Sequence, residues 1–120
     1  MSVTLQTIFA AYTARNYAAA QSMMNNYRAA NPETAQSAHL QGLISRRLGD
    51  IDGALGWMRH SLRLDPGNHE YLNNYAGCLL AAGRSAEAAD AWKEAAKARP
   101  AEPVYTEGLV RALSASGDHN

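Results

Sequence analysis

Residues 38–68 read AHLQGLISRRLGDIDGALGWMRHSLRLDPGN, and residues 71–102 read YLNNYAGCLLAAGRSAEAADAWKEAAKARPAE. Both stretches have a small residue, a glycine, an alanine and a proline at matching positions. Four columns of the sequence share a spacing of 34 residues. The columns are Pro32, Pro66 and Pro100; Gly49, Gly83 and Gly117; Ala20, Ala54 and Ala88; and Met24, Met58 and Trp92. A period of about 34 residues is typical of a two-helix unit that stacks on copies of itself.

Each column has a physical reason. Glycine ends a helix because it adopts the left-handed conformation of a C-cap without strain. In the first unit the matching residue is Arg15, and we expect the following Asn16 to adopt that conformation, which asparagine tolerates. The alanines are expected where two helices cross closely, and the large apolar residues in the space between paired helices. The prolines end the second helix of each unit.

The composition favours helices over strands. Valine and isoleucine, which favour strands, occur three times each among 120 residues, whereas alanine is abundant. We therefore predict an all-α chain that forms a single domain, because its length supports one modest core. The expected helices cover about 2–14, 18–30, 35–48, 52–64, 69–82, 86–98 and 103–115, grouped as repeat 1 (1–34), repeat 2 (35–68), repeat 3 (69–102) and a capping or partial fourth repeat (103–120).

Charge and cysteine content narrow the classes of partner and compartment. Eleven Lys and Arg residues balance eleven Asp and Glu residues, and from this neutral total we expect neither nucleic acid nor a membrane surface as a partner. We find neither a signal peptide nor an apolar run of about 18 residues, and we expect a cytoplasmic location. The lone Cys78 cannot form an internal disulfide and is expected to be an inert buried thiol.

The repeat pattern resembles the tetratricopeptide repeat family over nearly the whole chain. In repeats 2 and 3, the family signature is matched by Gly42 and Ala76 in the first helix, followed by the turn glycine, the crossing alanine and the closing proline. Repeat 1 departs from it, since Ile8 and Tyr27 stand where small residues are usual. The resemblance implies a right-handed α-solenoid of antiparallel helix pairs, with about three repeats plus one further helix, seven helices in all.

The resemblance also implies a function, which is to bind a peptide or partner segment in the concave groove lined by the first helix of each repeat. The candidate groove residues are Phe9, Tyr12, His39, Leu43, Arg46, Asn73, Asn74, Glu107 and Arg111. Some members of the family grip a C-terminal carboxylate with a Lys and Asn clamp. Only Asn74 matches that clamp when the register starts at repeat 2, so we do not expect one here.

Several of these candidates have a second interpretation. The stripe of Leu5, Ile8, Phe9 and Tyr12 either packs within its own helix pair or forms an apolar contact with a ligand or a second copy. Arg46 and Arg47 diverge by about 100° around a helix, so at least one of them is expected to be solvated; if Arg46 faces the groove, it could pair with an acidic partner segment. Asn73 and Asn74 disfavour helix interiors, which indicates an amide contact with a peptide or a hydrogen bond between helices.

The sequence carries no recognisable catalytic or metal-binding motif. It has no His-x-x-x-His or Cys-x-x-Cys pair, phosphate-binding glycine loop or nucleophile elbow, and we expect neither catalysis nor a cofactor. Two other functions stay open. One is an assembly or chaperone scaffold that self-associates through its terminal helices, and the other is the front region of a larger enzyme such as a transferase.

Overall fold

The computed structural model describes residues 3–117, and this part of the chain contains seven helices and no strand. The predictions of an all-α chain and of seven helices are confirmed. The helices are α1 (Leu5–Thr13), α2 (Tyr17–Ala30), α3 (Ala35–Arg47), α4 (Ile51–Leu64), α5 (His69–Ala81), α6 (Ser85–Ala98) and α7 (Pro103–Ser116).

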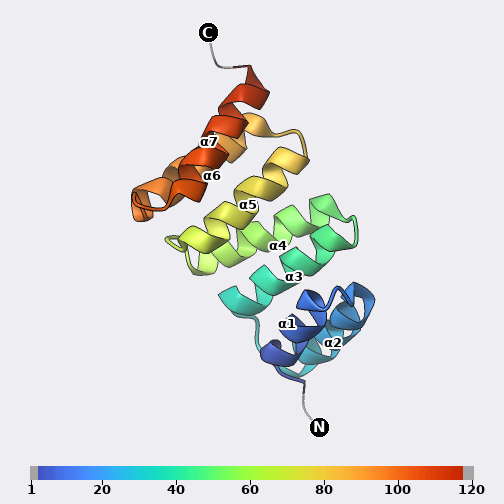
Figure 1. Cartoon of the computed structure of the whole chain (residues 1–120). Coiled ribbons are helices and arrows are strands. Elements are labelled where there is room, and N and C mark those ends of the chain that lie inside the picture. Colours follow the sequence, from blue (N-terminus) through green and yellow to red (C-terminus); the bar gives the residue numbers. More distant parts are fainter. Residues whose placement is uncertain (1–2, 118–120) are drawn as a thin grey trace. The chain divides into compact units, whose positions relative to one another are not determined.

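The chain divides into two compact units, which are described separately. Unit 1 (Met1–Leu64) holds the helix pairs α1–α2 and α3–α4, and unit 2 (Asp65–Asn120) holds α5, α6 and α7. Short turns join the helices of each pair, so that neighbours run antiparallel (Figure 1). Within unit 2, α7 packs mainly on α6 and also contacts α5.

The helix boundaries follow from local capping. Helix α1 begins at Leu5, later than the expected residue 2, because the Thr4 hydroxyl accepts a hydrogen bond from the backbone N–H of Thr7 at 3.2 Å. Thr34 caps α3 in the same way and forms a reciprocal capping box with Ser37.

The alanine column and the large apolar column are buried, as expected. Ala20, Ala54, Ala88, Met24 and Met58 are completely buried, and Trp92 is 2% exposed. At Gly42 a Cβ atom would lie 2.8 Å from Cγ of Met58 and 3.3 Å from the backbone oxygen of Ala54. The first helix of this pair therefore needs a residue without a side chain where it meets α4.

One expectation about the turns is wrong. Arg15 itself adopts the left-handed conformation, with φ of 64°, whereas Asn16 has φ of −94°. The backbone hydrogen bonds explain why. The N–H of Asn16 donates to the carbonyl of Ala11 at 2.9 Å, as the N–H of Asp50 donates to that of Ser45. The closing bonds of the turn fix which residue is left-handed.

We predict that Arg15→Gly stabilises the protein by about 1 kcal/mol, because an L-residue in this conformation carries a strain of roughly 1–2 kcal/mol, part of which the greater entropy of an unfolded glycine offsets. Urea unfolding of the full chain measures the change. Arg15→Ala is the matched control, since it loses the same charge and keeps the Cβ atom. Equal stabilities of the two variants would contradict the explanation.

Candidate functional site

A partly exposed aromatic cluster lies at the start of unit 1. Phe9 and Tyr12 on α1 stack with ring centroids 6.1 Å apart, and Tyr12 lies 5.6 Å from the ring of Tyr17, the first residue of α2. The side chain of Phe9 is 51% exposed, whereas Ile8 is fully buried. The apolar stripe of α1 is thus divided, because Ile8 serves the core and Phe9 faces solvent.

Helix α3 adds a second set of side chains to this cluster. His39, Leu43 and Arg46 follow one another at spacings that place them on the same side of a helix, and Leu43 and Tyr12 both pack against the core of unit 1. The neighbouring Arg47 donates from Nε to the hydroxyl oxygen of Tyr12 at 3.4 Å. This hydrogen bond, together with the electrostatic influence of Tyr12 and then of Tyr17, raises the pKa of Arg47.

We call Phe9, Tyr12, Leu43, Arg46 and Arg47 the aromatic–arginine patch; Arg46 is included by its position three residues after Leu43 on α3, where it is half-buried. Tyr12 links its parts, since it stacks on Phe9 and accepts the hydrogen bond from Arg47. Four of the five residues were sequence candidates. The sequence favours Arg46 over the adjacent Arg47, because repeat positions alone do not show which of the two reaches across to α1.

His39 differs from the patch residues, because it is buried. It is 7% exposed, and desolvation by burial lowers the pKa of its imidazole to about 4. At neutral pH it is therefore uncharged, and it adds no positive charge to the patch.

The sequence candidates of unit 2 surround Trp92. The side-chain oxygen of Asn73 accepts a hydrogen bond from the indole N–H of Trp92 at 2.8 Å, so Asn73 forms the interhelix bond that was one of its two interpretations. The guanidinium of Arg111 lies 5.5 Å from the centre of the Trp92 ring. Asn74 is half-buried on α5, and Glu107 is exposed one turn before Arg111 on α7.

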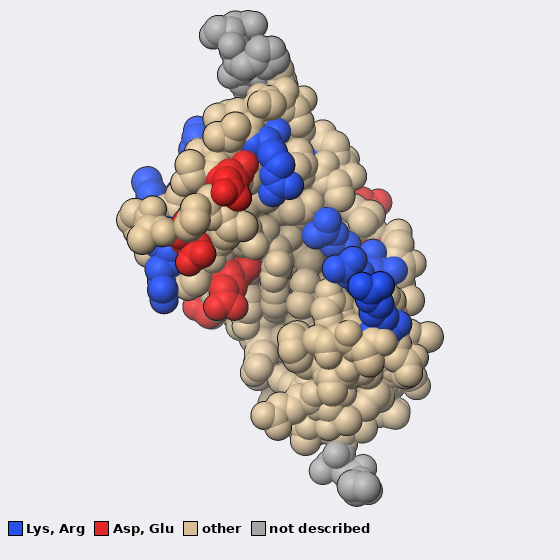
Figure 2. Space-filling view, in the orientation of Figure 1, with Lys and Arg blue, Asp and Glu red and all other residues tan. Residues whose placement is uncertain are grey.

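Charge separates the surface of unit 1 into two regions. Residues 1–27 contain one charged residue, Arg15, and the part of unit 1 formed by α1 and α2 is almost entirely uncharged in Figure 2. Basic side chains gather on the side of unit 1 where α3 ends (Figure 2). The basic residues in the last turn of α3 are Arg46 and Arg47.

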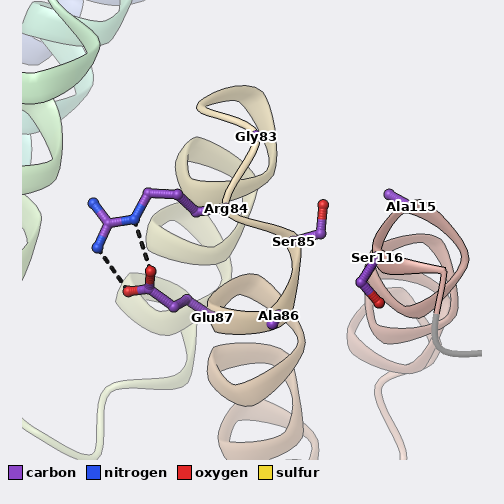
Figure 3. A pocket seen from close by; sticks show the side chains of 7 residues that line it. All are labelled: Gly83, Arg84, Ser85, Ala86, Glu87, Ala115 and Ser116. Carbon is purple, nitrogen blue, oxygen red and sulfur yellow. Dashed lines mark hydrogen bonds and ion pairs between the residues drawn. The ribbon is translucent and has the colours of Figure 1, made fainter.

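Unit 2 has two shallow hollows, and neither combines aromatic and basic side chains as the patch of unit 1 does. One, of about 390 Å³, lies between the start of α6 and the end of α7 and includes Ser85 and Ser116 (Figure 3). Its one basic side chain, Arg84, forms two bonds with the carboxylate of Glu87, at 2.8 and 2.7 Å. The other hollow, of about 580 Å³, lies on α6 and α7 beside Lys93, Lys97 and Leu109. Neither holds an aromatic side chain.

The part of the chain that the structure describes has neither a membrane-spanning helix nor a metal-binding cluster. Between residues 3 and 117, no helix combines the length and apolar character that crossing a bilayer requires. Over the same residues, His, Cys, Asp and Glu side chains form no group of three or more that could hold a metal ion.

The sequence matches one family model, described as anaphase-promoting complex, cyclosome, subunit 3, over residues 13–95. This family consists of tetratricopeptide-type repeats. No curated protein matches the chain. Because the matched segment spans most of the chain, the match assigns the chain to this family.

Solved structures share the fold. YrrB, described as a tetratricopeptide repeat protein with an unusual peptide-binding site, has a TM-score of 0.85 at 15% identity, over 95% of this chain. The chain spans 59% of the length of YrrB. The Yersinia enterocolitica type III secretion chaperone SycD, in complex with a peptide of the translocator YopD, has a TM-score of 0.74 at 20% identity, over 92% of this chain and 85% of SycD. PcrH, in complex with the chaperone-binding region of PopB, has a TM-score of 0.72 at 20% identity, over 92% of this chain and 90% of PcrH.

Proposed function

The chain belongs to the anaphase-promoting complex subunit 3 family of tetratricopeptide-type repeats, and we propose that it is a protein-interaction module that binds a peptide segment of a partner without catalysing a reaction. The observation that carries the proposal is the aromatic–arginine patch, where a half-exposed Phe9 stacks on a tyrosine that is hydrogen-bonded to an arginine. Aromatic and arginine side chains are the residues that most often dominate binding energy at interfaces.

Each residue has a distinct proposed role. Phe9, Tyr12 and Leu43 supply apolar contact, while Arg46 and Arg47 supply hydrogen-bond donors. Within unit 2, Asn74, Glu107 and Arg111 are further proposed contacts, and Asn73 acts indirectly by holding Trp92. His39 supports α3 as a neutral buried side chain. The solved complexes of SycD and PcrH with segments of their partners support a peptide as the ligand class.

A display selection tests the proposal. Random peptides are selected on the immobilised full chain, and the affinity of the enriched peptides is measured by fluorescence anisotropy. We predict that Phe9→Ala weakens binding by roughly tenfold or more, the loss typical of a truncated hot spot. Leu64→Ala is the matched control, because Leu64 on α4 is also 51% exposed. If both variants bind as tightly as the wild type, the patch is not the binding surface.

A second candidate, a scaffold that self-associates, is favoured by one face of α7. One repeat of 34 residues earlier, the positions of Val110 and Leu113 are occupied by Ala76 and Leu79. Both of these earlier residues are buried in unit 2. Val110 is instead 58% exposed, and Val104 also faces solvent. An apolar helix face of this kind commonly marks an interface.

For this second candidate, we predict that the wild-type chain forms a dimer whose fraction rises with concentration and that Val110→Glu abolishes it. Sedimentation velocity over a roughly hundredfold concentration range gives the monomer fraction, which follows mass action for a self-associating protein. Leu64→Glu, at another exposed aliphatic residue, serves as the control. A wild-type chain that stays monomeric throughout would exclude this candidate.

A further inference from the structure

Unit 1 carries an excess of positive charge, although the net charge of the whole chain is zero. Unit 1 holds six Lys and Arg residues against three Asp and Glu residues, whereas unit 2 holds five against eight. The neutral total therefore says little about the field that a ligand meets at either unit. A positive surface raises the local concentration of acidic ligands and their rate of association.

The two arginines of the patch have unused capacity to bind an anion. Within residues 3–117, Arg28 pairs with Glu33 and Arg84 with Glu87, but neither Arg46 nor Arg47 forms an ion pair. The hydrogen bond of Arg47 to Tyr12 uses Nε, and within residues 3–117 the terminal nitrogens of Arg47 have no hydrogen-bond partner. A guanidinium has five N–H donors, arranged to bind a carboxylate with two parallel bonds.

The position of Arg47 adds a requirement to that of negative charge, which is that the ligand carries an apolar group close to its carboxylate. Arg47 is bonded to Tyr12, and Tyr12 stacks on the exposed ring of Phe9, so a cation and an apolar surface lie next to each other. A carboxylate bound at Arg47 would bring the neighbouring residues of its own chain over the aromatic rings.

We propose that the partner segment is an acidic peptide in which an aromatic or large aliphatic side chain lies beside Asp or Glu residues, the apolar side chain contacting Phe9 and Tyr12 and the carboxylates binding Arg46 and Arg47. This inference rests on the proposed function and specifies the chemistry of its ligand. Arginines at the end of α3 also stabilise this helix, because their positive charge interacts favourably with its dipole. That role alone would change stability and not peptide affinity.

The test uses three synthetic peptides that share one central phenylalanine and differ in its flanks, which are Asp and Glu, their amides Asn and Gln, or Lys and Arg. Fluorescence anisotropy measures their binding to the full chain at low and high salt. We expect the acidic peptide to bind about tenfold more tightly than the amide peptide, the basic peptide to bind most weakly, and salt to weaken the acidic peptide most.

Variants connect the effect to the patch. Arg47→Gln and Arg46→Gln are each expected to weaken the acidic peptide about fivefold and to leave the amide peptide nearly unchanged. The matched control is Arg59→Gln, which removes the same charge from an exposed position on α4 and is expected to change affinity less than twofold. Thermal melting of each variant excludes loss of folding as the cause.

The outcomes separate this inference from the proposed function. If display-selected peptides bind through Phe9 while the acidic and amide peptides bind equally, the proposed function stands and the acidic ligand is wrong. If no peptide binds, selected or synthetic, both fail. An acidic peptide that binds equally to wild type and to the Arg46 and Arg47 variants, or a patch occupied only by a second copy of the chain, would also overturn the inference.

Discussion

Trp92→Ala is expected to lower the free energy of unfolding by about 3–5 kcal/mol, the usual cost of removing a large aromatic side chain from a core. The ring is 2% exposed and lies against Gly108, where even a Cβ atom would come within 2.3 Å of it. Its removal leaves a cavity next to Gly108, and this glycine of α7 has no side chain that could fill it. It also leaves the side-chain oxygen of Asn73 without the indole donor, which adds a desolvation cost.

Urea unfolding followed by circular dichroism measures this loss. Trp92→Phe is the informative companion, because it keeps a ring and removes the indole N–H, and we expect it to cost about 1–3 kcal/mol. Trp57→Ala is the control for losing a tryptophan, since Trp57 is only half-buried on α4. A loss below about 1 kcal/mol for Trp92→Ala would mean that unit 2 does not depend on this column of the repeat.

The second large effect is a fall in stability as the pH drops from about 6.5 to 4, caused by His39. Burial lowers the pKa of this imidazole from 6.5 to about 4 in the folded protein. Between pH 6.5 and pH 4, His39 is protonated in the unfolded chain and neutral in the folded chain, so a fall in pH favours unfolding. The free energy of unfolding is therefore unaffected by the titration of His39 well above pH 6.5, and this titration lowers it by about 3 kcal/mol by pH 4.

The measurement compares the unfolding free energy of wild type with that of His39→Leu at several pH values. Subtracting the two curves removes the titration of carboxylates, which both proteins share. The difference is expected to change by about 3 kcal/mol across this window. Curves that run parallel would show that the folded protein accepts a proton on His39 as readily as the unfolded chain does.

The sequence predicts the fold well because the determinants of the fold recur. Each column of the 34-residue period imposes the same steric requirement in each pair, and the burial of Ala20, Ala54 and Ala88 follows from that requirement. Arg15 is the exception to this recurrence. The preference of asparagine for left-handed backbone suggested Asn16, but the hydrogen bonds that close the turn fix the position and impose strain on an arginine.

The candidate site is less predictable because it depends on contacts between helices. Arg47 and Tyr12 are 35 residues apart, and nothing in the spacing of either helix shows that Nε of one reaches the hydroxyl of the other. The burial of His39 likewise depends on the packing around α3. Asn73 gave a usable signal, since its poor helix propensity indicated a specific hydrogen bond, but its partner Trp92 became clear only from the structure.

The most direct test of the proposed function maps a display-selected peptide onto the full chain by the changes it causes in backbone amide chemical shifts. We predict that the largest changes occur at the five patch residues, which are Phe9, Tyr12, Leu43, Arg46 and Arg47. Changes confined to the second helices α2, α4 and α6, with these five residues unaffected, would contradict it.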